Sequence, residues 1–311
     1  MRTESQNKAG RGVRAEGRDE TLDTLYAEPF RIERPVRQTV PFVFASPHSG
    51  SLYPESFVAA SRLSATSLRR SEDAFVDELF SGAVALGAPM LAARFPRAFL
   101  DVNRAPDELD QAMFEGPLSV AVDAPSARVA AGLGVVPRIV RDGAEIYRGR
   151  IAAREAEERL LRLYKPYHAA LAGLVEETRA HFGAAVVIDC HSMPSAAAAP
   201  DIVLGDRYGA SAAPMLTRHA DAAFQRHGFS VARNAPYAGG HTTLLHGRRD
   251  RDSHALQIEI NRTLYLDEER IVRGPRFADV HARLTAALTE LVAIELHVLR
   301  RARPNPRLAA E

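Results

Sequence analysis

The segment 184–192 reads "AAVVIDCHS", and it decides which fold the chain is expected to adopt. Its β-branched apolar core indicates a strand that is covered on both faces, as in the sheets of α/β proteins. Side chains alternate along a strand, so Asp189 and His191 should share one face while Cys190 points to the other. We therefore interpret Cys190 as a small buried packing residue rather than a nucleophile.

Other short apolar runs alternate with longer amphipathic segments along the chain. Runs of strand length and composition occupy 41–46, 89–95, 98–102, 201–205 and 255–260. Helical periodicity marks 64–86, 148–182, 211–227 and 277–301, with a break or kink expected at Pro166. Strands interleaved with helices predict an α/β sandwich with a mostly parallel or mixed central sheet.

The length of 311 residues accommodates one large domain, and no linker, repeat or shift in composition indicates a second one. Residues 1–24 begin with a polar stretch that lacks periodicity, so we expect a flexible N-terminal tail. Residues 303–311 are expected to form a C-terminal tail. A single folded domain is therefore predicted over 25–302.

The charges and the single cysteine exclude several classes of protein and site. Forty basic residues against thirty-nine acidic ones give a formal net charge of +1, so no broad positive field attracts nucleic acid. One cysteine rules out an internal disulfide and a multi-thiolate zinc site, so any metal must rest on His, Asp and Glu. The chain lacks a run of about 18 apolar residues, and its charged beginning does not fit a secretory signal. We therefore expect a cytoplasmic protein without nucleic-acid or membrane partners.

Polar side chains stand at the ends of four predicted strands, in "SPHSG" (46–50), "LDVNR" (100–104), "IDCHS" (188–192) and "QIEINR" (257–262). Ligands of open α/β sheets bind at the carboxyl ends of the strands. If these ends lie on one edge of the sheet, their histidines, carboxylates and arginines converge there. The pattern therefore predicts an active site.

His48 and His191 are candidate metal ligands, because a metal site needs imidazoles or carboxylates that converge from different elements. Taken alone, each histidine could equally bond to the backbone at a strand end. A zinc hydrolase takes three protein ligands and keeps one position open for water. The third candidate comes from "RRSEDAFVDELF" (69–80), where Glu72 and Asp73 stand at a predicted helix start and Asp77 follows one turn later. Solvated helix capping is the alternative role for this acidic cluster.

Glu259 interrupts an otherwise apolar strand, where an unpaired carboxylate is costly. It is interpreted as a general base whose pKa is raised by desolvation, or alternatively as a partner of Arg262 or Arg104 in a buried ion pair. Both arginines follow an asparagine, and their planar forks suit a substrate carboxylate, although each could instead anchor a loop.

Two glycine-containing segments supply further candidates for substrate binding. The segment 132–147 contains Arg138 and Tyr147 and is interpreted as a surface loop. The segment 235–248 places His241 directly after a glycine pair, which fits either a mobile loop over the pocket or an ordinary hairpin turn.

Taken in order, the short motifs resemble those of the N-formylglutamate amidohydrolase family. The series runs over about residues 40–269 and comprises "SPHSG", "VDELF", "DVNR", "GVVPR" leading to "IY", "KPYHAAL", "DCHS", "DIVLG", "GGH" and "QIEINRTLYLDE". The resemblance implies a zinc-dependent hydrolase with a three-layer α/β/α sandwich, related to the zinc carboxypeptidases. The family reaction releases formate from N-formyl-L-glutamate in a route of histidine degradation.

The resemblance also implies roles for individual residues. His48 and His191 match two metal ligands, and Glu259 stands where the catalytic carboxylate of such hydrolases lies. Asn103 and Arg104 are similar to the Asn-Arg pair that holds a substrate carboxylate in carboxypeptidases. One departure concerns the His-x-x-Glu motif of those enzymes, because Ser51 stands three residues after His48. The family pattern before "VDEL" points instead to Asp73, with Glu72 beside it.

The combined prediction is an amidohydrolase with one zinc ion, held by His48, Asp73 and His191, and with Glu259 as general base. The predicted substrate is an acidic N-acyl amino acid, bound by Asn103, Arg104, Arg138, Tyr147, His241 and Arg262. The alternatives are a deacylase for another N-acyl amino acid and a non-catalytic binding protein that keeps the pocket. The sequence predicts no particular oligomeric state.

Overall fold

The computed structural model describes residues 18–120, 122, 126–140, 143–196 and 199–300 of the chain. Within them, seven strands form one sheet in the order β1-β3-β2-β6-β9-β7-β8. These strands are β1 Phe30–Glu33, β2 Phe42–Ser46, β3 Met90–Ala93, β6 Ala185–Met193, β7 Ile202–Gly205, β8 Val231–Arg233 and β9 Ser253–Asn261. The described pairs β1–β3 and β7–β9 are antiparallel and the other neighbours are parallel, so the predicted mixed, mostly parallel sheet is confirmed.

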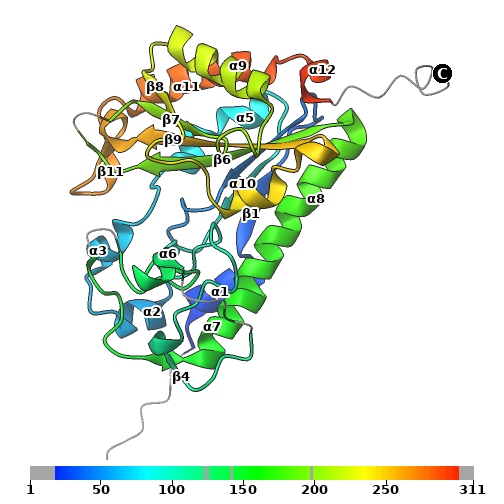
Figure 1. Ribbon diagram of the computed structural model, residues 1–311. Coiled ribbons are helices and arrows are strands. Elements are labelled where there is room, and N and C mark those ends of the chain that lie inside the picture. The colour runs from blue at the N-terminus through cyan, green and yellow to red at the C-terminus, as the bar shows by residue number, and fades with distance from the viewer. Residues whose placement is uncertain (1–17, 121, 123–125, 141–142, 197–198, 301–311) are drawn as a thin grey trace, which may run out of the picture.

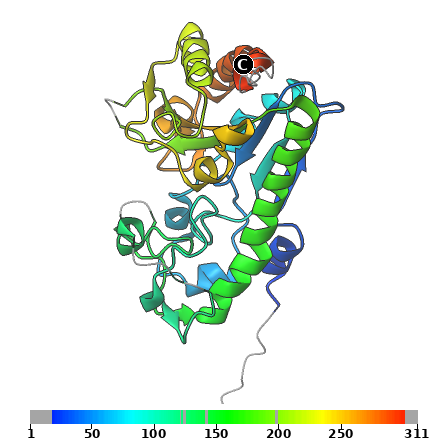
Figure 2. The ribbon, with the colours of Figure 1, turned by 45° about the vertical axis from the view of Figure 1, so that its right-hand side comes forward.

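Helices cover both faces of this sheet (Figures 1 and 2). The side chains of β2 separate alternately into two cores. Val43 lies on the side of helix α8 (Lys165–Phe182), and Phe44 lies on the side of α4 (Val76–Leu79), α9 (Pro214–Arg226) and α11 (Phe277–Val292). The predicted α/β sandwich is therefore confirmed. The helices are α1 Glu20–Ala27, α2 Glu55–Ala60, α3 Ala65–Arg69, α4 Val76–Leu79, α5 Gly82–Ala85, α6 Ala127–Ala130, α7 Ala153–Arg159, α8 Lys165–Phe182, α9 Pro214–Arg226, α10 His241–His246, α11 Phe277–Val292 and α12 Leu296–Leu299.

The lower part of the molecule in Figure 1 consists mainly of short helices and irregular segments, joined to the sheet by the long helix α8. Apolar side chains from this part pack into the core that also holds the α8 face of the sheet. Short elements complete the description: η1 Gln111–Met113, β4 Phe114–Glu115, β5 Ile151–Ala152, η3 Leu160–Tyr164, η4 Arg249–Arg251, η5 Arg262–Leu264, β10 Leu266–Asp267 and β11 Val272–Arg273.

Several predicted elements differ from those in the structure. The segment 98–102 is buried but is not a strand, because its backbone bonds to a neighbouring irregular segment, with Asp101 N donating to Val135 O at 2.8 Å. The predicted helix at 64–86 is divided into α3, α4 and α5, and Phe75 between them has a positive φ of 62°. The break expected at Pro166 takes the form of a π-helical turn, Leu160–Tyr164, directly before α8. The glycine pair before His241 leads into the short helix α10 rather than a hairpin.

Part of the predicted N-terminal tail, residues 1–24, is helical in the structure. Helix α1 begins at Glu20, its Asp19 side chain accepts a hydrogen bond from Leu22 N at 3.0 Å, and Leu25 is buried. The capping carboxylate and the buried leucine explain why the helix starts inside the predicted tail of 1–24. Residues 1–17 and the predicted C-terminal tail at 303–311 lie outside the described residues.

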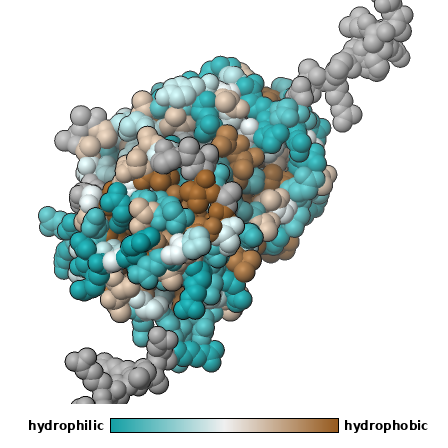
Figure 3. Space-filling model, turned by 60° about the horizontal axis from the view of Figure 1, so that its bottom comes forward, coloured by the Kyte–Doolittle hydropathy of each residue, from teal (hydrophilic) through white to brown (hydrophobic). Residues whose placement is uncertain are grey.

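The surface carries both polar and apolar regions. Figure 3 shows apolar side chains gathered near the middle of the face seen from below, bordered by hydrophilic ones. Exposed large apolar residues of the described chain include Leu161, Leu244 and Leu245. Among the helices that the structure describes, none combines the length and the apolar character needed to cross a bilayer.

Candidate active site

The carboxyl ends of β2 and β6 bring two histidines together. These strands are parallel neighbours, with His48 two residues after β2 and His191 near the end of β6. Their ring centroids lie 4.8 Å apart. The turn at His48 is fixed by close packing of Gly50, since an added Cβ would lie 2.2 Å from Phe95 O. Glycine is thus the residue that lets the strand end approach the neighbouring backbone.

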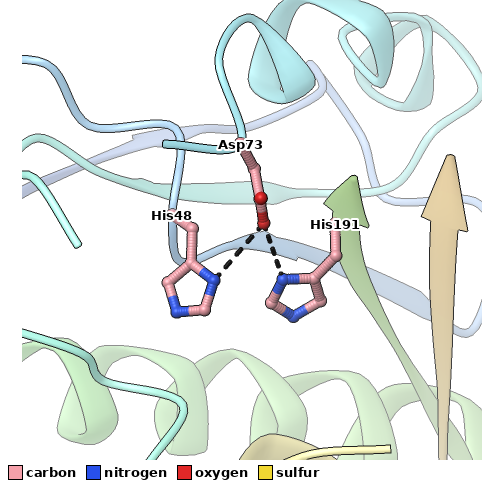
Figure 4. Close-up of side chains that lie close together, drawn as sticks. All are labelled: His48, Asp73 and His191. Atoms are coloured by element: carbon pink, nitrogen blue, oxygen red, sulfur yellow. Dashed lines mark hydrogen bonds and ion pairs between the residues drawn. The ribbon is translucent and has the colours of Figure 1, made fainter. Parts of the chain in front are cut away.

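Asp73 lies between these two imidazole rings (Figure 4). Its Oδ2 atom is 2.9 Å from His191 Nδ1 and 3.3 Å from His48 Nδ1. The loop before α4 places it there through a hydrogen bond from Asp73 N to His48 O at 3.0 Å. All three side chains are buried, and one ligand atom from each lies within 4.8 Å of the others. This group can hold a metal ion.

The second nitrogen of each histidine faces a buried carboxylate. His48 Nε2 is 2.7 Å from Asp101 Oδ1, and His191 Nε2 is 3.1 Å from Asp189 Oδ2. Carboxylates behind metal-binding histidines fix the tautomer and the ring orientation and leave the other nitrogen free to ligate. Consistent with this, the Nδ1 atoms of both histidines point toward Asp73. The donor set therefore fits a bound cation.

The electrostatics of the site also favour a cation. Burial alone would raise the pKa of Asp73, but the hydrogen bonds and positive charges of His191 and His48 together outweigh it and hold that pKa well below its usual range. Burial likewise lowers the pKa of His191, but Asp189, Asp73 and Glu259 together outweigh it and raise this pKa well above its ordinary value. The surrounding carboxylates thus stabilise positive charge at the point where the three side chains meet.

The other acidic candidates for the third ligand point elsewhere. Glu72 is buried, but it accepts hydrogen bonds from Arg69 Nε at 2.9 Å and Tyr53 Oη at 2.7 Å. Asp77 pairs with Arg31. The structure therefore brings Asp73, rather than Glu72 or Asp77, to the two histidines.

Glu259 lies directly across from His191 in the register of β6 and β9. It is 7% exposed, and its Oε1 accepts a hydrogen bond from Gln257 Nε2 at 2.7 Å. Burial, opposed in part by His191, raises the pKa of Glu259 from 4.5 to about 7. Within the described residues it makes no ion pair with Arg262 or Arg104, so the alternative of a buried ion pair is wrong. Its carboxylate instead faces the same cavity as the histidines.

This cavity has a volume of about 330 Å³, and its walls have two different origins. We call the residues from the carboxyl ends of the strands, His48, His191, Gln257 and Glu259, the strand wall. We call Arg97, Asp101, Asn103 and Arg104, from the irregular segment 94–104, together with Arg128 from helix α6, the loop wall. Among the described residues, five arginines line the cavity: Arg70, Arg97, Arg104, Arg128 and Arg262.

Asn103 and Arg262 line the cavity but mainly hold other residues in place. Asn103 donates from Nδ2 to Asp189 Oδ2 at 3.2 Å, while its Oδ1 accepts from Thr242 N at 2.8 Å. The close packing needs Gly240, where an added Cβ would lie 2.5 Å from the Asn103 amide. Arg262 donates to Asp73 Oδ1 at 2.9 Å and to backbone carbonyls. Arg262 thus positions Asp73, and its role in binding substrate stays a prediction.

Arg104 keeps part of its guanidinium available to the cavity. Its Nε donates to Leu133 O at 3.0 Å and its Nη1 to Asn103 O at 3.1 Å. Its Nη2 has no acceptor among the described residues, and its side chain is 12% exposed. The arginine is thus anchored at one end and open at the other.

Three residues expected to bind substrate do not line the cavity. Arg138 faces Asp110 and Glu145, whereas its neighbours Pro137 and Ile139 turn toward the cavity. Tyr147 is buried with its hydroxyl accepting from Arg159 Nη1 at 2.8 Å. His241 packs on the ring of His168, with centroids 5.8 Å apart, and leaves the preceding glycines at the cavity. The structure therefore does not bring these three side chains to the cavity, because motif order does not determine where the side chains of irregular segments point.

Sequence reasoning missed several residues of the cavity. Asp101 stands within the quoted motif "LDVNR", and its position two residues before Asn103 was the available signal. Arg97 donates to Asp101 Oδ2 at 3.0 Å. Neither Arg97 nor Arg128 follows a predicted strand in a recognisable motif, so no sequence signal distinguished them from surface arginines.

Known proteins resemble this chain over most of its length. A family model described as N-formylglutamate amidohydrolase matches residues 40–266. The N-formylglutamate deformylase of Pseudomonas aeruginosa is 30% identical over 243 residues, which cover 75% of this chain and 85% of the relative. That of Pseudomonas putida is 28% identical over 238 residues, covering 74% and 83%.

Two solved structures are also similar. The N-formylglutamate amidohydrolase from Ralstonia eutropha JMP134 superposes with a TM-score of 0.79 at 36% identity, over 85% of this chain and 96% of that chain. The gene product Atu2144 from Agrobacterium tumefaciens has a TM-score of 0.62 at 19% identity, over 85% and 95%, and supports the fold alone. Because the family model spans most of the folded chain, the resemblance found in the sequence is confirmed: the chain belongs to the N-formylglutamate amidohydrolase family.

Proposed function

We propose that the protein is a metal-dependent amidohydrolase that cleaves the formyl amide of N-formyl-L-glutamate into formate and glutamate. The observation that carries this proposal is the placement of Glu259 directly across from His191, in the cavity where His48, Asp73 and His191 meet. A binding protein has no need of a buried carboxylate with a raised pKa beside a cation site.

His48, Asp73 and His191 would hold the metal ion through two imidazole nitrogens and one carboxylate oxygen. This donor set suits zinc, and three protein ligands are typical of catalytic zinc sites. When bound, zinc would act as a Lewis acid toward the formyl carbonyl and make water a better nucleophile. Arg262 and Asp101 hold Asp73 and His48 in the orientation that this requires.

Glu259 is the proposed general base. It takes a proton from the attacking water as the water oxygen bonds to the formyl carbon. As the carbon–nitrogen bond breaks, the same carboxyl group returns the proton to the nitrogen of glutamate. A base whose pKa lies near neutrality can do both.

Arg104 is the proposed partner of a substrate carboxylate. Its anchored Nε and Nη1 fix the guanidinium, and its Nη2 remains available at the cavity. Asn103 contributes through its backbone oxygen, which accepts from Arg104, and through its side chain, which braces Asp189. Arg97 adds positive charge on the same wall.

Formate release from N-formyl-L-glutamate by the purified, metal-loaded protein tests the proposal. We expect turnover that a chelator removes and added zinc restores, with a stoichiometric metal content by elemental analysis. Parallel assays with N-acetyl- and N-succinyl-L-glutamate distinguish a deformylase from a deacylase for larger acyl groups. Absence of turnover on every N-acyl glutamate, with metal fully bound, would contradict the proposal.

A further inference from the structure

The arginines that line the cavity differ in how closely they pair with carboxylates of the protein. Arg262 is paired with Asp73 at 2.9 Å, and Arg97 with Asp101 at 3.0 Å. Arg104 has its nearest carboxylate oxygen at 3.9 Å, also from Asp101. Within the described residues, the side chain of Arg128 makes no ion pair or hydrogen bond, although it lines the cavity. The loop wall therefore holds more positive charge than its single carboxylate, Asp101, can pair.

Backbone bonds place Arg128 on the same wall as Arg104. Leu133 N donates to Arg128 O at 2.8 Å, and Leu133 O accepts from Arg104 Nε at 3.0 Å. The start of α6 is fixed as well, because Ser126 Oγ accepts from Val129 N at 3.2 Å. Arg104 is thus held against the turn that follows α6, which is the helix that carries Arg128.

The two guanidinium groups are near enough to influence one another. Burial is the main cause that lowers the pKa of Arg104, and the positive charges of Arg97 and Arg128 lower it further. Like charges on one wall are unfavourable unless an anion binds between or beside them. The geometry of α6 and Leu133 therefore prepares a position for an anionic group of the substrate.

Arg104 and Arg128 lie at different depths relative to the candidate metal ligands. Asp101 contacts His48 at 2.7 Å and lies 3.9 Å from Arg104, so a single residue links Arg104 to the metal ligand. Arg104 is only partly exposed, whereas Arg128 is exposed. Arg104 therefore lies deeper in the cavity, nearer to the metal ligands, and Arg128 belongs to the outer part of the wall.

N-formyl-L-glutamate carries two carboxylates at different distances from the reacting amide. The α-carboxylate carbon is two bonds from the amide nitrogen, whereas the side-chain carboxylate carbon is four bonds away. Two anionic groups that enter a partly buried cavity each need a cationic partner. We propose that Arg128 is a specificity-determining residue that binds the side-chain carboxylate of the substrate, while Arg104 binds the α-carboxylate. This assignment rests on the proposed function.

The test compares N-formyl-L-glutamate with N-formyl-L-glutamine, which has the same shape and keeps the α-carboxylate but carries a neutral side-chain amide. In the wild-type enzyme, kcat/KM should favour the glutamate compound. In Arg128→Gln, kcat/KM for N-formyl-L-glutamate should fall about 10- to 100-fold, mainly through KM, while the value for N-formyl-L-glutamine changes less than about threefold. Arg128→Lys should restore part of the preference, because a point charge replaces the planar fork.

Two further variants make the result specific to Arg128. Arg154→Gln removes an exposed arginine of α7 that does not line the cavity, and it should change neither kcat/KM value. Arg70→Gln removes another arginine of the cavity, next to the loop that carries Asp73. An unchanged preference in Arg128→Gln, or loss of the preference in Arg70→Gln instead, would overturn the assignment and leave the deformylase function intact. A wild-type enzyme that hydrolyses neither compound would overturn both proposals.

Discussion

The strand wall and the loop wall of the cavity are built in different ways and suit different tasks. On the strand wall, His191 and Glu259 are paired across neighbouring strands and almost fully buried. On the loop wall, Arg97 and Arg104 project from irregular backbone, and Arg128 projects from the four-residue helix α6. Regular strands fix reacting groups accurately, whereas loops tolerate substitution more readily. Under the proposed function, this difference assigns the chemistry to the strand wall and substrate selection to the loop wall.

The largest effect is expected from the strand wall. Glu259→Gln keeps the shape of the side chain but removes the proton acceptor, so kcat should fall about 100- to 10,000-fold. Metal content, measured by elemental analysis, should stay the same, because Glu259 is not among the three residues that can hold the ion. Glu72→Gln is the matched control, since Glu72 is a buried carboxylate that does not line this cavity. A similar fall of kcat in both variants would mean that lost stability, not lost chemistry, explains the result.

The next effect tests the contact between the two walls. Asp101→Asn weakens the carboxylate behind His48 while keeping its size, so metal affinity should fall about 10- to 100-fold. Competition with a chelator measures this change. Asp206→Asn alters a buried aspartate outside the cavity and should leave metal affinity unchanged. An unaltered affinity in Asp101→Asn would show that the strand wall holds the ion without support from the loop wall.

A smaller effect is expected from Arg104 on the loop wall. Arg104→Gln removes a charged partner of the substrate carboxylate, so KM for N-formyl-L-glutamate should rise about tenfold or more, with kcat less affected. Hydrolysis of a neutral formyl amide without carboxylates should change little. If the variant loses activity equally with both substrates, Arg104 contributes to the structure of the site in general rather than to substrate selection.

The smallest effect concerns pH. Glu259 must be deprotonated to accept a proton, and its burial raises its pKa from 4.5 to about 7. Turnover should therefore decline as the pH falls through this pKa, by about tenfold for each further pH unit. A bound cation lowers the pKa, so the midpoint for the metal-loaded enzyme should lie between 4.5 and 7. The pH profile of kcat measures it, and a flat profile down to pH 4.5 would contradict this role of Glu259.

The same division between the walls explains what the sequence could predict. His48, His191 and Glu259 were recognisable because a polar residue at the end of an apolar strand is conspicuous and the carboxyl ends of parallel strands meet at one edge. The alternation that separates Asp189 and His191 from Cys190 follows from strand geometry alone, and the structure places Cys190 in the core on the opposite face. The regular alternation of side chains along strands therefore made the residues of the strand wall predictable from the sequence.

Irregular backbone limited the prediction on the loop wall. Arg128 and Arg138 are both arginines in loop-rich segments, yet only Arg128 lines the cavity. Their directions depend on tertiary hydrogen bonds, such as Asp101 N to Val135 O, which no local pattern encodes. Asp73 was one of three acidic candidates, because helix-start chemistry does not distinguish a ligand from a cap.

The contact between Arg262 and Asp73 has a consequence for the choice of metal. Arg262 and Ser192 occupy one oxygen of the Asp73 carboxylate, so only the other oxygen faces the two imidazoles. A bidentate carboxylate is thereby disfavoured, and the coordination shell offered by the protein is small and rich in nitrogen. Calcium, which requires six to eight oxygen ligands, should be discriminated against, whereas ions content with few ligands should be accepted. Arg262, which is not itself a ligand, would therefore restrict which ions can bind at His48, Asp73 and His191.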